Sequence, residues 1–246
     1  MSLPFSNTTT KNGIIQQIER NCGFSDGGIS SDATLLAQFT GDINSAIDKV
    51  LSIIFSVGGT WQYDDSNHTD YPIITTNIVS GQRDYSFSVD GSSNLILEIH
   101  KAFVSDSNGN FTELYPVDVS NQRAPVNYTD GLNTQGIPVS YDKLGTGIFL
   151  DPIPNYNYSG GLKLYVDREA SYFTTSDTTK KPGFAGIFHE YLALRPSYQY
   201  SIRKELPTAV QFEREMLKME DAIASFYKSR DKDHVKRLIP RVNNAH

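Results

Sequence analysis

The sequence is poor in cysteine and in long apolar runs, and each shortage excludes a class of protein. Its 246 residues include a single cysteine, Cys22. That count excludes a disulfide framework within the chain and a zinc site built from several cysteines. No segment approaches the roughly 18 uninterrupted apolar residues of a membrane-spanning helix, so we expect no membrane partner. The first residues, MSLPFSNTTTKNG, lack a basic stretch followed by an apolar run, so we expect no secretory signal.

Sequence motifs of catalysis are also missing. His189 and Glu190 begin like the helix of a zinc protease, but the second histidine four residues after the first is absent. The segment 145–147, Gly-Thr-Gly, has neither the lysine of a phosphate-binding loop nor a helix after it. The segment 64–70 has metal-like spacing but lacks the glycine and terminal glutamate of a calcium loop, so a solvated loop is the simpler interpretation. We therefore predict no catalytic residue, no metal and no cofactor, and no enzyme activity.

Helical patterns occupy both ends of the chain. Apolar residues at three- and four-residue steps predict a long helix over 31–57, which Ser30 or Ser31 can cap. A shorter helix is predicted over 11–22, with Gly23 as its stop. Two further helical stretches are predicted over 184–205 and 207–229. Pro196 removes one intrahelical hydrogen bond, so we expect a kink or a break near Arg195.

The last helical stretch has a predicted buried face and a predicted solvent face. Its buried face is expected to hold Val210, Leu217, Ile223 and Phe226. Its solvent face is expected to hold Glu213, Arg214, Lys218 and Glu220.

The middle of the chain reads as short strands. They are predicted at 73–79, 83–89, 95–104, 112–119, 139–144, 147–150 and 162–170. Ser80-Gly81 and Asn108-Gly109 each separate two strands, as hairpin turns do, and Gly160-Gly161 precedes the last strand. Consecutive strands with short turns and no helices between them predict an antiparallel sheet or a small sandwich. The segment 125–136 is predicted to be a long exposed loop.

These patterns predict an α+β fold. Residues 1–62 and 178–229 would form a bundle of three to four helices, and residues 63–177 would form an inserted antiparallel β-rich domain. Residues 230–246 would form an extended C-terminal tail. The tail region is basic, because residues 228–241 hold six basic and two acidic residues. This segment carries +4 of a net charge of −6, so the rest carries −10. A basic tail on an acidic body indicates an acidic partner surface or phosphate, and a solvated terminus is the other interpretation.

The order of several motifs resembles the head-to-tail adaptor (connector) proteins of tailed bacteriophages. The runs GIPVSY at 136–141, GIFLDPIP at 147–154 and LKLYVDR at 162–168 follow the order of that family. So do WQYD at 61–64, the predicted hairpin 72–85, PGF at 182–184 and EYLALRPSYQY at 190–200. The similarity spans about 35–227. Pro196 departs from the family pattern.

The resemblance implies a structural role in the virion. Such adaptors form rings, commonly of twelve subunits, beneath the portal of a DNA-filled head. Their helical part and C-terminal tail grip the portal protein, and their β unit faces a downstream tail or nozzle protein. Double-stranded DNA passes through the ring without specific binding. The resemblance thus implies a protein of the head–tail junction that resides in the host cytoplasm during assembly.

Two groups of residues are candidates for these roles. The tail residues expected to bind the portal are Arg230, Lys236, Arg237, Leu238, Ile239, Arg241 and Val242. The acidic residues expected to face the lumen of the ring are Asp42, Asp48, Glu213, Glu220 and Asp221, although an ordinary solvated helix face also accounts for each of them.

Other classes of function remain open at this point. Another structural protein of the phage neck or tail would have a related build. A carbohydrate-binding module could use the 14 tyrosines, and a hydrolase could use carboxylates that sequence alone does not pair. Aromatic residues at alternating strand positions are more typical of a core than of a carbohydrate platform. These are Tyr85, Phe87, Phe103, Phe149 and Tyr165.

Overall fold

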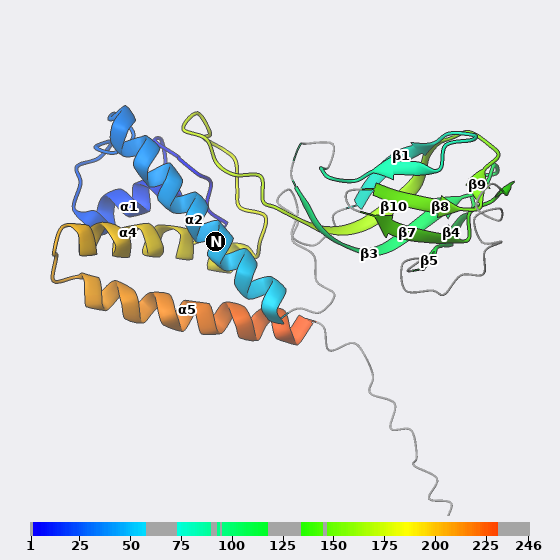
Figure 1. The fold of residues 1–246 in the computed structure, drawn as a ribbon. Coiled ribbons are helices and arrows are strands. Elements are labelled where there is room, and N and C mark those ends of the chain that lie inside the picture. The colour runs from blue at the N-terminus through cyan, green and yellow to red at the C-terminus, as the bar shows by residue number, and fades with distance from the viewer. Residues whose placement is uncertain are drawn as a thin grey trace, which may run out of the picture. The chain divides into compact units, whose positions relative to one another are not determined.

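The structure, a computed structural model, describes residues 2–57, 73–89, 93, 95–117, 134–144 and 147–230. The chain divides into two compact units, and Figure 1 shows the elements of each. The helical unit comprises Met1–Trp61, Phe173–Lys180 and Gly186–His246. The β unit comprises Gln62–Tyr172 and Lys181–Ala185. The fold is thus mixed α and β. Within the described ranges, no helix is long and apolar enough to cross a membrane.

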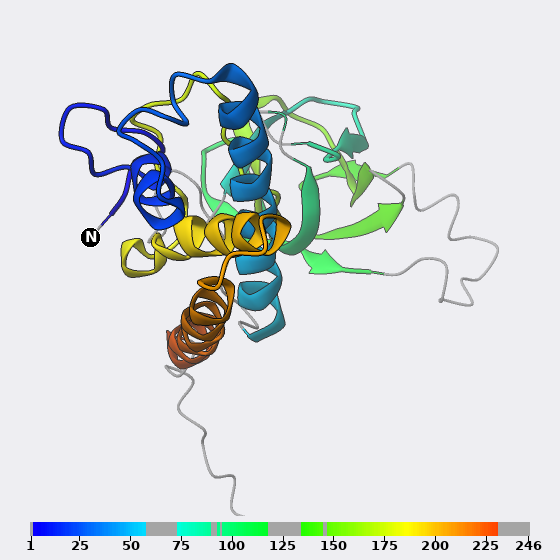
Figure 2. The ribbon, with the colours of Figure 1, turned by 90° about the vertical axis from the view of Figure 1, so that its left-hand side faces the viewer.

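The described residues of the helical unit form four α-helices. They are α1 (Ile14–Cys22), α2 (Ala33–Val57), α4 (Tyr191–Arg203) and α5 (Ala209–Arg230), with a short 3₁₀ helix, Gly186–Phe188, before α4. Helix α4 contacts the three other helices, and α2 also contacts α5. Figure 2 shows α4 crossing α2. Helices from the two ends of the chain therefore share one core.

The apolar side chains that predicted the long helix lie on the buried face of α2. Seven apolar side chains on one face are buried, and they are Phe39, Ile43, Ala46, Ile47, Val50, Leu51 and Ile54. The predicted cap at Ser30 or Ser31 is wrong. The carboxylate of Asp32 accepts the backbone N–H groups of Thr34 at 2.8 Å and Leu35 at 3.0 Å, which is the geometry of an N-cap. Helix α1 ends as predicted, because Gly23 has a φ of 74° and ends the helix in the left-handed region.

Helix α4 lacks the break that was one of the two outcomes expected at Pro196, and α5 buries a different stripe from the predicted one. Helix α4 runs through Pro196 without a break, and the Ser197 hydroxyl donates to the Ala193 carbonyl at 2.7 Å within it. In α5, Ile223 is buried as predicted, but Val210 and Leu217 are 57% and 52% exposed. Met216 and Tyr227 are buried instead. The buried stripe is therefore rotated around α5 from its predicted position.

The described residues of the β unit form a small sandwich of two four-stranded sheets. One sheet has the order β1–β10–β3–β4, with β1 at Ile73–Ile78, β10 at Tyr158–Arg168, β3 at Ile96–Ser105 and β4 at Phe111–Glu113. The other has the order β2–β8–β7–β5, with β2 at Asp84–Ser86, β8 at Gly147–Asp151, β7 at Ser140–Leu144 and β5 at Tyr115–Pro116. A two-stranded sheet pairs β6 (Gln135–Gly136) with β9 (Ile153–Pro154). Buried side chains of both large sheets form one hydrophobic cluster.

Most strand pairs are antiparallel, as predicted, and two short pairs, β5–β7 and β6–β9, are parallel. The Asn108-Gly109 hairpin is confirmed, because β3 pairs with β4 and Gly109 has a φ of 88°. The predicted hairpin around Ser80-Gly81 is wrong, since β1 pairs with β10 and β2 pairs with β8. Gly160 and Gly161 lie inside β10 rather than before a strand. A Cβ on Gly161 would come within 2.8 Å of Ile78, so this glycine permits a close approach between β10 and β1.

Several sequence predictions fall on residues whose placement is not described. They concern Trp61, the segment 64–70, the loop residues 125–133 and the tail after Arg230. They stay predictions.

Candidate functional site

Glu220 of α5 lies at the centre of a contact among three helices. Its Oε1 accepts a 2.6 Å hydrogen bond from the Tyr191 hydroxyl of α4, and its Oε2 lies 3.8 Å from Lys49 Nζ of α2. The Glu220 side chain is 17% exposed, so the prediction of a solvent-facing Glu220 is wrong. Burial raises the pKa of Tyr191, and the hydrogen bond to Glu220 raises it further. The phenol therefore remains a donor at neutral pH.

Asp42 of α2 is also paired within the subunit. Arg203, at the end of α4, places its guanidinium 2.7 Å from Asp42 Oδ2. This ion pair is half exposed on the arginine side, so water screens it and its contribution to stability is small. Asp42 and Glu220 therefore each have a cationic partner in their own chain.

The three other acidic candidates lie on the surface of the helical unit. Asp48 of α2 and Glu213 and Asp221 of α5 are all exposed. Of the five acidic residues expected to face the lumen, these three are exposed.

Three exposed apolar residues, the apolar row, lie near these carboxylates in sequence: Ile202, Val210 and Leu217. Val210 and Leu217 are seven residues apart in α5, which places them on the same side of that helix. Ile202 in the last turn of α4 is 51% exposed. A contiguous patch of such side chains marks a surface that another protein covers, whereas singly exposed ones are ordinary.

The predicted portal-binding residues begin at the end of α5. Arg230 is the last residue of that helix. The other six, from Lys236 to Val242, lie outside the described residues. The contacts of the tail therefore stay a prediction.

His189 has a structural role, and the Cys22 thiol is not activated. His189 is buried, and its Nδ1 accepts the Leu3 N–H at 3.0 Å, so it fastens the N-terminal segment to the start of α4. Burial raises the pKa of the Cys22 thiol, against smaller lowering effects of Ser197 and Arg203. A thiol that stays protonated at neutral pH is a poor nucleophile.

The aromatic residues of the strands divide between core and surface. Tyr85 is buried in the sandwich and Phe87 packs against its core, as predicted. Phe103 and Tyr165 point to the opposite face of their sheet, where their rings lie 5.4 Å apart in an edge-on contact. That contact occupies part of both rings, and nothing in the arrangement favours a carbohydrate platform over a packed surface pair.

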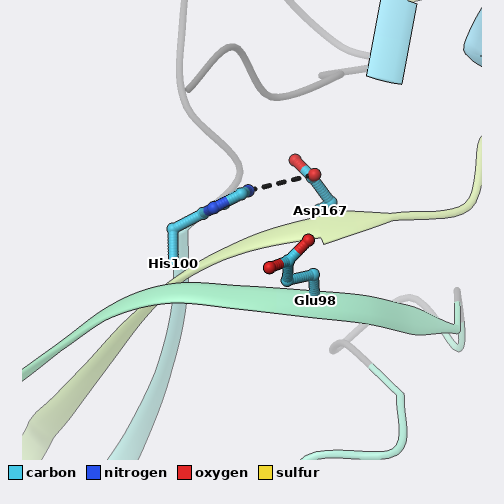
Figure 3. A group of neighbouring side chains, drawn as sticks. All are labelled: Glu98, His100 and Asp167. Carbon is cyan, nitrogen blue, oxygen red and sulfur yellow. Dashed lines mark ion pairs between the residues drawn. The ribbon is translucent and has the colours of Figure 1, made fainter. Parts of the chain in front are cut away.

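A cluster that the sequence analysis missed lies on the non-core face of the first sheet. Glu98 and His100 of β3 and Asp167 of β10 each bring one ligand atom within 4.8 Å of the others (Figure 3). His100 Nε2 is 3.0 Å from Asp167 Oδ2. Burial raises the pKa of Asp167, the facing imidazole of His100 lowers it, and Glu98 adds a smaller upward effect.

A β-bulge brings this cluster together. In the β3–β10 register, Lys101 faces Tyr165 and Ile99 faces Val166, so His100 is an extra residue with no partner. Ile99 and Ala102 point into the core, and His100 and Lys101 between them both point away from it. Glu98 faces Asp167 directly across the strands. The sequence gives no signal for this, because the two strands are about 70 residues apart and strand register is not local.

No protein-family model matches the chain, and comparison with characterised proteins finds no significant match. The function is therefore argued from the residues and their geometry.

Proposed function

We propose that this chain is a head-to-tail adaptor, a structural protein of a tailed-phage virion that forms a ring under the portal. The observation that carries the proposal is the composition of the helical unit, which is built from both ends of the chain, while the β unit is built from its middle. In this proposal the fold is a bundle of helices with an inserted β-rich domain, followed by a portal-binding tail after Arg230.

Three motifs of the resemblance support the proposal because they lie in the framework of the two units, whereas the expected hairpin over 72–85 is absent and WQYD at 61–64 lies outside the described residues. The GIFLDPIP run supplies β8 and β9, and the LKLYVDR run supplies most of β10, the strand that pairs with both β1 and β3. The EYLALRPSYQY run supplies most of α4, whose residues Tyr191 to Leu194 are all buried. The likeness therefore rests on residues that determine the fold rather than on surface composition.

The surface of the helical unit supports assembly into a homo-oligomer. Ile202, Val210 and Leu217 are each at least half exposed. In the proposed ring, the neighbouring subunit covers this row. Glu213 and Asp221 lie four residues before and after Leu217 on the same side of α5. In the proposed ring the subunit contact ends at these carboxylates, which border the lumen and would repel the phosphates of passing DNA.

The partners follow from this role. The helical unit and the tail bind the portal protein, the β unit meets a downstream tail or nozzle protein, and double-stranded DNA passes without specific binding. The protein resides at the head–tail junction of the virion and in the host cytoplasm during assembly.

Particle mass, measured alone and with the cognate portal protein, tests the proposal. We expect a ring of many subunits, about twelve by the resemblance, either free or on the portal, and electron microscopy should show a central channel. A stable monomer that ignores the portal and binds glycans would overturn the proposal in favour of the carbohydrate-binding alternative.

A further inference from the structure

The cluster of Glu98, His100 and Asp167 has a donor set suited to a transition-metal ion. One imidazole nitrogen and two carboxylate oxygens are ligands that Zn²⁺ and Mn²⁺ accept. On an ion with bonds of about 2.1 Å, neighbouring tetrahedral ligands are roughly 3.4 Å apart. The 3.0 Å separation of His100 Nε2 and Asp167 Oδ2 is close to that value, and all three ligand atoms lie within 4.8 Å of one another.

A buried carboxylate oxygen of the cluster lacks a hydrogen bond in the described part of the chain. The Asp167 side chain is only 10% exposed, and its Oδ1 has no hydrogen-bond partner in the described part of the chain. His100 Nε2 lies 3.0 Å from Asp167 Oδ2, in a contact that lowers the pKa of this carboxyl. An ion bound here would give the buried Asp167 carboxylate a second charge partner.

The strand register also places two carboxylates side by side. Glu98 and Asp167 are directly opposite each other on β3 and β10, and like charges in that position destabilise a strand pair. Figure 3 shows His100 and the two carboxylates on the same side of these strands. A cation at this point would neutralise both carboxylates and fasten two neighbouring strands.

We propose that Glu98, His100 and Asp167 bind a divalent transition-metal ion, with Zn²⁺ or Mn²⁺ as the occupant. The ion connects β3 to β10, and the remaining coordination positions hold water. Glu98 is exposed, so the ion reaches the site from the side of this residue. The β-bulge at His100 turns the imidazole toward the ion. This site is independent of the proposed adaptor role.

The test uses the full chain, free of any affinity tag and stripped with a chelator. Titration with Zn²⁺ or Mn²⁺, followed by calorimetry and thermal unfolding, should show one saturable site and a rise in the Tm of the β unit of about 3–6 °C at saturating metal. Mg²⁺ should give a weaker response because it prefers all-oxygen sites. Replacement by Co²⁺ should give the visible absorption of a nitrogen- and oxygen-ligated ion.

Variants decide where the ion binds. Glu98→Gln removes an exposed ligand while keeping the bulge, and it should weaken binding by about tenfold or more. His100→Ala should abolish the Tm shift. Glu113→Gln is the matched control, because Glu113 pairs with Lys101 on the same sheet and lies outside the cluster, so its binding should equal that of the wild type. No saturable binding to the wild type, or equal binding to Glu98→Gln, would overturn the proposal.

Discussion

The hydroxyl of Tyr191 donates a 2.6 Å hydrogen bond to Oε1 of Glu220. Tyr191 begins α4 and Glu220 lies in the middle of α5, so the bond joins two helices of the C-terminal part of the chain. Lys49 Nζ, 3.8 Å from the other carboxylate oxygen, extends the contact to α2. A single carboxylate thus connects helices from both ends of the sequence.

Tyr191→Phe should therefore destabilise the helical unit. The change leaves the shielded Glu220 carboxylate without its strongest donor, and a lost hydrogen bond to a charged group costs about 1.5–3 kcal/mol. Urea unfolding at neutral pH measures the loss. Tyr200→Phe is the matched control, since the Tyr200 ring packs on Phe24 and Phe39 and phenylalanine keeps those contacts. Equal losses in the two variants would show that the Tyr191 hydrogen bond is not the cause.

The same tyrosine predicts a difference in alkaline stability. In the unfolded chain Tyr191 ionises near pH 10, and in the folded protein its pKa is higher, first because of burial and then because of Glu220. Its contribution to stability is therefore complete below about pH 10 and declines as the pH rises from there toward the folded pKa. The stability advantage of the wild type over Tyr191→Phe should shrink above pH 10. An advantage that grew with pH would contradict this direction.

Local sequence patterns predicted the elements better than they predicted their partners. The seam of α2, the stop at Gly23 and the Asn108-Gly109 hairpin depend on neighbours within a few residues, and all three were predicted correctly. The partner of β1 is β10, about 85 residues later, and no local signal distinguishes it from the adjacent β2. Turn residues at Ser80-Gly81 reverse the chain without deciding which sheet each strand joins.

The candidate site residues were also predicted well where local patterns decide and poorly where residues distant in sequence decide. Periodicity predicted that α5 has a buried face but placed it on Val210 and Leu217, because apolar residues lie on more than one side of this helix. Glu220 was predicted to be solvated, since its partners Tyr191 and Lys49 lie far away in sequence. The Glu98–His100–Asp167 cluster depends on a bulge and on strand register, which are tertiary properties.

Leu217→Glu should block ring formation without unfolding the subunit. In the proposed ring a neighbouring subunit covers Leu217, and burying a charge there without a partner is unfavourable. In the isolated subunit the side chain is already half exposed, so the Tm should change little. Gln211→Glu, an exposed position on another side of α5, is the control and should assemble normally. Mass photometry measures both, and rings formed by Leu217→Glu would exclude this row from the subunit contact.

Truncation after Arg230 should abolish attachment to the portal while the subunit stays folded. This end point keeps all of α5 and removes the predicted apolar anchors Leu238, Ile239 and Val242 together with most of the basic residues. The truncated chain should keep the helical content and Tm of the wild type but fail to join portal-bearing heads, because an extended segment that orders on binding supplies much of the contact area. Removing only residues 243–246 is the control. Normal incorporation of the longer truncation would show that the tail is dispensable.

The charge of the channel gives the last prediction. The chain outside the basic segment 228–241 carries −10, and a ring of about twelve subunits would be strongly acidic. Asp42 and Glu220 contribute little to the field in the lumen, because Arg203 and Lys49 lie beside them. Exposed residues of α5, Glu213 and Asp221, are then the main candidates to face the DNA.

An acidic wall leaves the duplex with its counterions, whereas a basic wall would release them and hold the DNA. The isolated ring should therefore show no measurable duplex binding at physiological salt, and truncation after Arg230 should not create any. Replacing both Glu213 and Asp221 by lysine should create binding that weakens steeply as salt rises, while lysine at Gln211 should create less. Fluorescence anisotropy with a labelled duplex measures all of these. Tight, salt-sensitive binding by the unmodified tail-less ring would show that its lumen is basic.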